Sequence, residues 1–328
     1  MKRNTDLDFI RAILIILMIL IHIVSFGNAY PQLKAGILSF MMPTFLIITG
    51  YLVNIEKTGR QMGNYLKCLA LPYVIMVTGF SVLSYYMPVR DGITELSLSQ
   101  IGEKIFVTSI GPYWFIQTMI ICGTLYYFCF SGRNWNDLRR NYTKRDTYAS
   151  LFVFAVTLLL ISETPALSAS AAAYYFIGVV IRQSKTEWNK LFRHEFFAII
   201  LWIYLLNHDD WYDWGSLAIV FSCWCCISTL LLLQHLLDAP ERFKDISPKI
   251  GKVAKVTNRI KDTLLYIGRN TLPIYLFHPI FTMAAKFYHP LFSWDPSEIC
   301  FALFTVILAI LGSIAIARIM EKTKLAYL

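Results

Sequence analysis

The stretch "LDFIRAILIILMILIH", Leu7 to His22, decides the fold class, because it is apolar enough to enter a membrane and still carries ionisable side chains. These are Asp8, Arg11 and His22. A charged side chain at the centre of a bilayer costs about 2.5–3.5 kcal/mol even on the scale derived from insertion experiments. Ionisable residues in such a helix are therefore expected to have a function.

The composition of the whole chain is that of a membrane protein. Apolar types make up 56% of the 328 residues and charged types only 16%, whereas soluble domains have about 25% charged residues. The charged residues gather in short segments between long apolar runs. We predict an all-α fold, a polytopic bundle of membrane helices that forms one domain over residues 1–328.

Ten apolar runs are predicted as transmembrane helices because of their length. They cover residues 8–26, 35–53, 66–87, 113–130, 148–165, 166–182, 195–208, 214–236, 263–287 and 299–317. If the N-terminus is cytoplasmic, the inner segments hold 24 lysines and arginines and the outer segments hold four. This asymmetry predicts that both termini are cytoplasmic. It also accounts for the net charge of +9 without a nucleic-acid partner.

A basic amphipathic segment, residues 238–262, precedes the ninth apolar run. Within it, "SPKIGKVAKVTNRIKDT" begins with a Ser-Pro helix start and combines apolar and basic residues on different faces. We interpret it as a cytoplasmic interfacial helix held against anionic lipid. A cationic surface for a polyanionic cofactor is the alternative.

No metal site is predicted. The chain has seven cysteines, all in or beside apolar runs. The "CWCC" at residues 223–226 lacks the histidines or spaced cysteines of a zinc site. We interpret these cysteines as residues that pack between helices.

The first helix carries its ionisable side chains on one face. At about 100° per residue, Arg11 and His22 are about 20° apart, and Asp8 lies within about 60° of both. A local ion pair of Asp8 with Arg11 would settle the helix end, and a hydrogen bond to another helix would explain His22. A second helix with similar features favours a functional site instead.

The ninth run contains "IGRNTLPIYLFHP", in which Thr271, Tyr275 and His278 share one face. His278 is predicted to lie at the same depth as His22, whereas Arg269 would point to the opposite face of a continuous helix. Histidine is the side chain best suited to proton transfer near neutral pH. The two histidines therefore predict a buried polar site.

Asp8, Arg11 and His22 also match the opening D-x-x-R and R-x(10)-H pattern of a known family. The chain resembles the acyltransferase-3 family of integral-membrane O-acyltransferases, which modify bacterial surface glycans. Three further motifs follow in the order typical of that family: Phe45, Thr49, Gly50 and Tyr51; Trp114 and Phe115; and Gly268, Thr271, Leu272, Tyr275 and His278. Thr49 stands where the family usually has serine. Tyr113 departs from common versions of the motif that contains Trp114 and Phe115.

The resemblance implies transfer of an acyl group, usually acetyl, from cytosolic acyl-CoA to a hydroxyl of a cell-surface or lipid-linked glycan. No metal cofactor is implied. His22 would be the catalytic base or would carry the acyl group, with His278 as a second base. Arg11 and Arg269 would bind the phosphates of acyl-CoA, and Asp8 would hold Arg11 in place.

The resemblance also suggests residues that contact the reacting groups. Tyr275, Thr271 and Thr49 would donate hydrogen bonds to the developing oxyanion. Trp114 would stack against a sugar or would anchor the helix at the membrane interface. The expected location is the inner (plasma) membrane of a bacterial cell envelope.

Two other functions use the same intramembrane charges. A secondary transporter would also place a histidine proton relay near the membrane midplane, but the two halves of this chain show no repeat. A non-catalytic partner for polysaccharide export or assembly is the third possibility. The sequence leaves the acyl group, the acceptor hydroxyl and the oligomeric state open.

Overall fold

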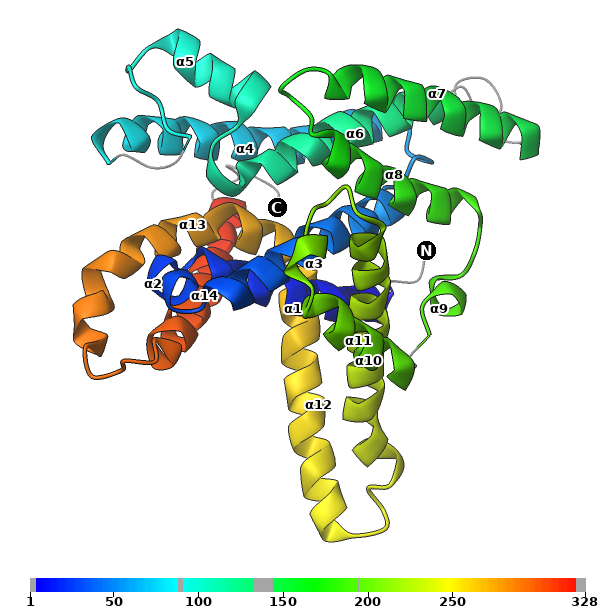
Figure 1. The fold of residues 1–328 in the computed structure, drawn as a ribbon, viewed down its shortest axis with the longest axis vertical. Helices are drawn as coiled ribbons and strands as arrows, with labels where there is room; N and C mark the ends of the chain where they lie inside the picture. Colours follow the sequence, from blue (N-terminus) through cyan, green and yellow to red (C-terminus); the bar gives the residue numbers. More distant parts are fainter. Residues whose placement is uncertain (1–3, 88–90, 132–143, 194, 323–328) are drawn as a thin grey trace. The chain divides into compact units, whose positions relative to one another are not determined.

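The computed structural model describes residues 4–87, 91–131, 144–193 and 195–322, which form helices and connecting segments without any strand (Figure 1). The predicted all-α class is confirmed. The α-helices are α1 (Thr5–His22), α2 (Val24–Ala29), α3 (Pro31–Leu52), α4 (Gly59–Tyr86), α5 (Leu98–Glu103), α6 (Trp114–Ser131), α7 (Lys144–Ser162), α8 (Ala169–Gln183), α9 (Trp188–Leu191), α10 (Phe196–Leu206), α11 (Leu217–Arg242), α12 (Pro248–Arg269), α13 (Thr271–Tyr288) and α14 (Ile299–Lys322). Short 3₁₀ or π turns, η1 (Lys104–Thr108), η2 (Gly111–Tyr113), η3 (Asp209–Trp211) and η4 (His289–Phe292), connect them.

The chain is a membrane protein. Six stretches within the described residues are helical, long and apolar enough to cross a bilayer: Pro31–Leu52, Gly59–Tyr86, Gly111–Phe130, Arg145–Ser162, Leu217–Arg242 and Ile299–Lys322. The other four predicted spans correspond to α1, α8, α10 and α13. Of these, α8 has 15 residues and α10 has 11, fewer than the about 20 that usually cross a bilayer. The total of ten spans stays a prediction.

The orientation of the chain in the membrane also stays a prediction. Some of the basic residues that were counted for it, in 1–3, 88–90, 132–143 and 323–328, lie outside the described residues.

Side-chain caps fix where several helices begin, among them α1, α4 and α12. The Asn4 side chain accepts hydrogen bonds from the first backbone N–H groups of α1, and Thr58 with Gln61 forms a capping box at α4. Ser247 accepts from the backbone N–H of Lys249 at α12. The predicted Ser-Pro helix start is thus confirmed.

The predicted boundaries of the ninth run are wrong. Residues 263–287 do not form one helix, because α12 includes the basic segment and continues to Arg269, where the chain breaks before α13. Pro273 gives the physical reason, since it has no backbone N–H to donate to the carbonyl of Arg269. The Asn270 side chain instead donates to the carbonyl of Tyr266 at 2.7 Å and closes the end of α12.

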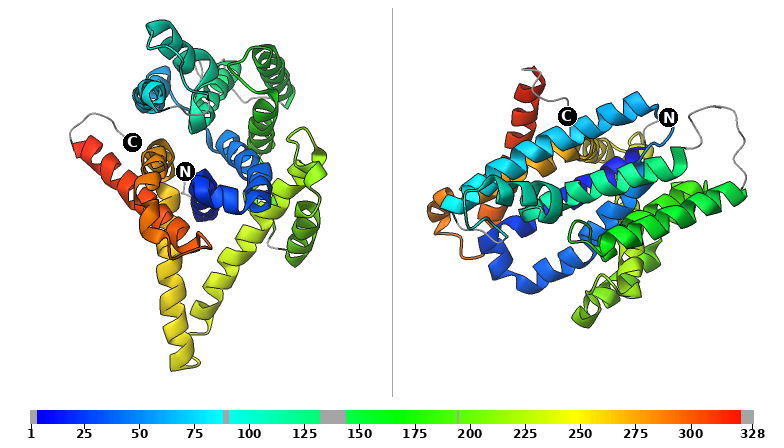
Figure 2. Two further views of the ribbon diagram at one scale, coloured as in Figure 1. Left: turned by 60° about the vertical axis from the view of Figure 1, so that its left-hand side comes forward. Right: turned by 90° about the horizontal axis from the view of Figure 1, so that it is seen from above.

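The chain divides into two compact units. That residues 1–328 form a single domain stays a prediction. Unit 1 comprises Met1–Phe45 and Thr186–Arg318, and unit 2 comprises Leu46–Lys185 and Ile319–Leu328. In unit 1, α1 packs against α11, α12 and α13. Helices α11 and α12 form an antiparallel pair that Figures 1 and 2 show from three sides.

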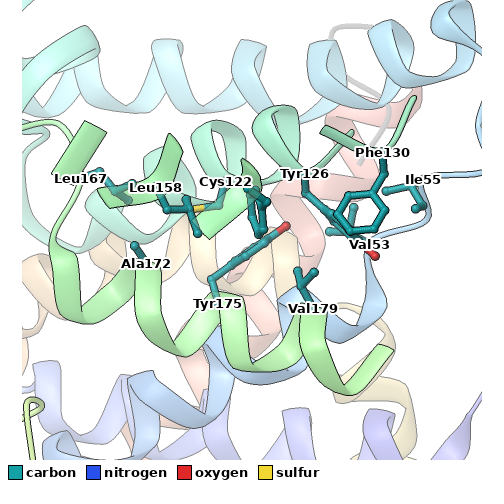
Figure 3. Packing of buried hydrophobic residues seen from close by; sticks show 11 residues of the cluster. Val53, Ile55, Cys122, Tyr126, Phe130, Leu158, Leu167, Ala172, Tyr175 and Val179 are labelled. Carbon is teal, nitrogen blue, oxygen red and sulfur yellow. The ribbon is translucent and has the colours of Figure 1, made fainter. Parts of the chain in front are cut away.

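In unit 2, α6 packs against α4, α7 and α8, and an apolar cluster lies between α6, α7 and α8 (Figure 3). The buried members of this cluster are Val53, Ile55, Cys122, Tyr126, Phe130, Phe154, Leu158, Leu167, Ala172, Tyr175 and Val179. Helix α8 crosses the end of α3 at two glycines. A Cβ at Gly50 would overlap the carbonyl of Tyr175, and one at Gly178 would overlap the carbonyl of Ile47. Small residues allow such close crossings of membrane helices.

Candidate active site

Two helices of unit 1, α1 and α12, hold a buried carboxylate near two guanidinium groups. Asp8 of α1 is 3% exposed. Its Oδ1 lies 3.8 Å from Nη1 of Arg11, one turn further along α1, and its Oδ2 lies 3.9 Å from Nε of Arg269 at the end of α12. Because a buried charge is costly without partners, the three side chains form one electrostatic unit.

The position of Arg269 corrects the sequence prediction. A continuous helix would have turned Arg269 away from the polar face that carries His278. The break at Asn270 ends α12 beside α1, so Arg269 contacts Asp8 instead. The close approach of the two helices depends on Gly268, where a Cβ would overlap the carbonyl of Asp8.

Arg11 also contacts a third helix, α13. Its guanidinium donates a hydrogen bond to Oγ1 of Thr271, the first residue of α13. Thr271 is buried, whereas the side chain of Arg11 keeps 24% of its surface accessible. A guanidinium that is held by neighbours and still accessible is well suited to bind a phosphate.

His22 and His278 meet edge to face, with ring centroids 5.3 Å apart and an interplanar angle of 73°. Nδ1 of His22 lies 2.6 Å from the carbonyl of Met18, and Nδ1 of His278 lies 2.8 Å from that of Tyr275. A carbonyl only accepts, so each Nδ1 carries the hydrogen, and Nε2 holds the lone pair of a neutral ring. The two histidines, which were predicted to lie at one depth on separate helices, are thus in contact.

Nε2 of His278 is buried and has no hydrogen-bond partner among the described residues. Buried polar atoms without a partner are rare and often mark functional sites. The ring of Tyr275, 4% exposed, lies 5.8 Å from that of His278. Thr271, Tyr275 and His278 are therefore all buried along α13, as their spacing predicts.

The two parts of the site are separated along α1, with Arg11 in its first half and His22 as its last residue. Arg11 and His22 are eleven residues apart, which corresponds to about 16 Å along a helix axis. The arrangement fits an elongated molecule with an anionic group at one end and a reactive group at the other.

Two predicted substrate-binding residues, Thr49 and Trp114, belong to unit 2. Thr49 is half-buried near the end of α3, next to the crossing at Gly50. Trp114 is half-buried at the start of α6, with its ring 6.1 Å from that of Phe115. Their roles stay predictions.

The structure adds a polar contact that the sequence did not lead us to expect. Gln234 of α11 is 6% exposed, and its Nε2 donates to Oδ1 of Asp6 on α1 at 3.1 Å. The signal was present, since Gln234 interrupts the apolar run "TLLLLQHLL" of the eighth predicted helix. Within the described ranges, no three His, Cys, Asp or Glu side chains are placed to hold a metal ion.

Comparisons with known proteins identify the family. A family model described as an acyltransferase domain matches residues 4–318, which is nearly the whole chain. Searches of curated proteins and of solved structures found no match. The matched range includes Asp8, Arg11, His22 and His278. This chain therefore belongs to the acyltransferase-3 family and is a membrane acyltransferase.

Proposed function

We propose that this chain is an O-acetyltransferase that moves an acetyl group from cytosolic acetyl-CoA to a hydroxyl of a cell-surface or lipid-linked glycan. The observation that carries the proposal is the division of α1 between an arginine cluster and a histidine pair. Acetyl-CoA has the matching form, with phosphates at one end and a thioester at the end of a long, thin arm.

The arginine cluster would receive the donor. Arg11 and Arg269 would bind its phosphates, because guanidinium groups form paired hydrogen bonds with phosphate oxygens. Asp8 would act as a positioning residue, since its carboxylate lies within 3.8 Å of one guanidinium and 3.9 Å of the other. The acyl arm would then extend along α1 towards His22.

The histidine pair would carry out the transfer. Nε2 of His22 takes the proton of the acceptor hydroxyl, whose oxygen attacks the thioester carbonyl carbon. Tyr275 donates a hydrogen bond to the oxyanion that forms, and Thr49 is a further candidate donor. Thr271 was predicted for the same role, but its Oγ1 accepts from Arg11 and belongs to the arginine cluster. The C–S bond then breaks, and the departing CoA thiolate takes the proton from His22. Nε2 of His278 is the second base.

A second route uses the same nitrogen as a nucleophile. Nε2 of His22 would attack the thioester, release CoA and hold the acetyl group until the acceptor hydroxyl takes it. Denaturing the chain during turnover with labelled acetyl-CoA distinguishes the routes, because only this one leaves label on the protein.

In the membrane, we place ten spans with both termini in the cytoplasm of a bacterial cell, in the inner (plasma) membrane. The six apolar helices and the asymmetry of the basic residues support this placement. Trp114 would stack against the acceptor sugar.

Inverted membrane vesicles, whose cytoplasmic face is outside, test the proposal. They receive acetyl-labelled CoA, and label is followed into glycan for the wild type and His22→Ala at matched protein level. General base catalysis contributes about 10²–10⁴-fold, so we expect a loss of that order. The control is His208→Ala, because this histidine stacks on Trp211, with ring centroids 4.3 Å apart, outside the site.

Equal labelling by the wild type and His22→Ala would show that His22 is structural. Binding of acetyl-CoA to the purified chain is measured in parallel. A wild-type chain that does not bind acetyl-CoA would contradict the proposed donor.

A further inference from the structure

A pocket of about 200 Å³ lies in unit 1, where the start of α1 meets α11 and the segment that follows α9. Its lining includes Asp6, Phe192, Arg193, Gln234, His235 and Asp238. Trp224 of α11 donates its indole N–H to the carbonyl of Leu191 at 3.2 Å and fixes this segment against α11. The mechanism proposed above does not use this pocket.

One of the side chains that line the pocket has a buried hydrogen-bond acceptor without a donor. Gln234 is 6% exposed, and its Nε2 is already used by Asp6. Its Oε1 has no hydrogen-bond partner within the described part of the chain. Because leaving a buried acceptor unpaired is costly, a ligand that supplies an N–H or O–H donor fits this position.

The charges around the pocket restrict the kind of ligand further. Lys261 neutralises Asp238, with its Nζ 2.5 and 2.7 Å from the two carboxylate oxygens. Arg193 adds a positive charge at the exposed side, and the buried ring of Phe192 adds an apolar surface. A partly apolar group that carries an amino donor and is attached to phosphates matches these features.

We propose that the pocket binds the adenine end of the acyl-CoA donor, an inference that rests on the proposed function. The exocyclic amino group of adenine donates to Oε1 of Gln234. Glutamine side chains recognise adenine through this amino group in nucleic-acid complexes as well. The pocket is thus a nucleobase site that selects donors with an adenosine group.

The order of residues along α1 agrees with the order of groups in acyl-CoA. Asp6 lines the pocket, Arg11 follows about 7.5 Å further along the axis, and His22 lies about 24 Å from Asp6. At about 100° per residue, Asp6 lies about 140° around the helix from Arg11, so a donor in the pocket would pass around the first turn of α1 to reach the arginine cluster.

The test compares CoA with 1,N6-etheno-CoA, in which the amino group of adenine is closed into a ring and cannot donate. Both are titrated into the full chain in lipid nanodiscs, for the wild type and Gln234→Leu. One hydrogen bond corresponds to about 5–10-fold in affinity, so the wild type should prefer CoA by that factor. Gln234→Leu should bind the two nucleotides equally.

The ratio of the two affinities is the readout, because a general disturbance by the variant would weaken both nucleotides alike. The wild-type comparison also stands alone if Gln234→Leu does not fold. A wild type that binds CoA and etheno-CoA equally would overturn the pocket assignment and leave the proposed function intact. A wild type that binds neither would overturn the proposed function itself.

Discussion

Both units bury polar atoms without a hydrogen-bond partner among the described residues, and two of these atoms have very different surroundings. In unit 2, one such atom is the hydroxyl oxygen of Tyr175, inside the apolar cluster that Figure 3 shows. In unit 1, one such atom is Nε2 of His278, with the His22 ring 5.3 Å away. An unpaired buried polar atom costs free energy in both units. The His278 nitrogen in unit 1 lies beside a second histidine, which can take part in proton transfer.

The two units are otherwise assembled in the same way. Gly50 and Gly178 allow α3 and α8 to cross closely in unit 2, and Gly268 does so for α1 and α12 in unit 1. The difference is that the crossing in unit 1 lies beside an acid, Asp8, with two arginines around it. Close helix packing alone therefore does not mark the active site, whereas a buried acid between two arginines at a close crossing does.

The largest expected effect is a difference in acetyl transfer between variants of His278 and of Tyr175. His278→Ala removes the second base and should lower acetyl transfer by about 10²–10⁴-fold. Tyr175→Phe removes only an unpaired hydroxyl and should leave transfer unchanged, while raising the free energy of unfolding by up to about 1 kcal/mol. Labelled acetyl transfer in vesicles and thermal unfolding of the purified variants measure the two quantities.

Equal activity of His278→Ala and the wild type, at matched protein level, would make the His278 nitrogen a packing defect like that of Tyr175. A large loss of stability in Tyr175→Phe would instead show that the tyrosine hydroxyl has a structural role.

The polar faces that carry the site could be predicted from spacing, because the residues of each face lie within one helix. Thr271, Tyr275 and His278 are all buried in α13, and the two histidines predicted at one depth are in contact. The contact of Arg269 with Asp8 could not, because it depends on a helix break that only backbone hydrogen bonding around Pro273 explains. Helical periodicity does not extend across such a break.

The pocket could not be predicted for a different reason. Its residues come from three segments far apart in the sequence, and Gln234 is a single polar residue in a long apolar run. Nothing in the local sequence indicates that its side chain reaches Asp6. Tertiary packing, and not local periodicity, decides that contact.

A smaller effect is expected at the crossing of α1 and α12. Gly268→Ala places a methyl group against the carbonyl of Asp8 and should lower the free energy of unfolding by about 1–3 kcal/mol, because the helices must separate. Acetyl transfer should fall as well, since Arg269 would move away from Asp8. Thermal unfolding and the vesicle assay measure both effects.

Gly79→Ala is the matched control, because a Cβ at Gly79 would meet no atom within 4 Å. An alanine in the interior of α4 should stabilise the chain by about 0.5–1 kcal/mol. If Gly268→Ala behaved like Gly79→Ala, the close crossing would not be a requirement of the site.

The smallest expected effect is a pH dependence at the start of α14, away from both unpartnered atoms. The hydrogen bond from Ser297 to the Asp295 carboxylate, with further bonds from the backbone N–H groups of Phe301 and Cys300, lowers the pKa of Asp295. A lowered pKa in the folded state stabilises the chain above the ordinary aspartate pKa of about 3.9. That stability is lost as the pH falls through the folded-state pKa.

Asp295→Asn isolates this contribution, because asparagine has no charge to lose. The unfolding midpoint of the wild type should exceed that of the variant at neutral pH, and the difference should shrink below about pH 4. A difference that stays constant across this pH range would mean that the charge of Asp295 makes no pH-dependent contribution to stability. In that case the charge of Asp295 would not stabilise the start of α14.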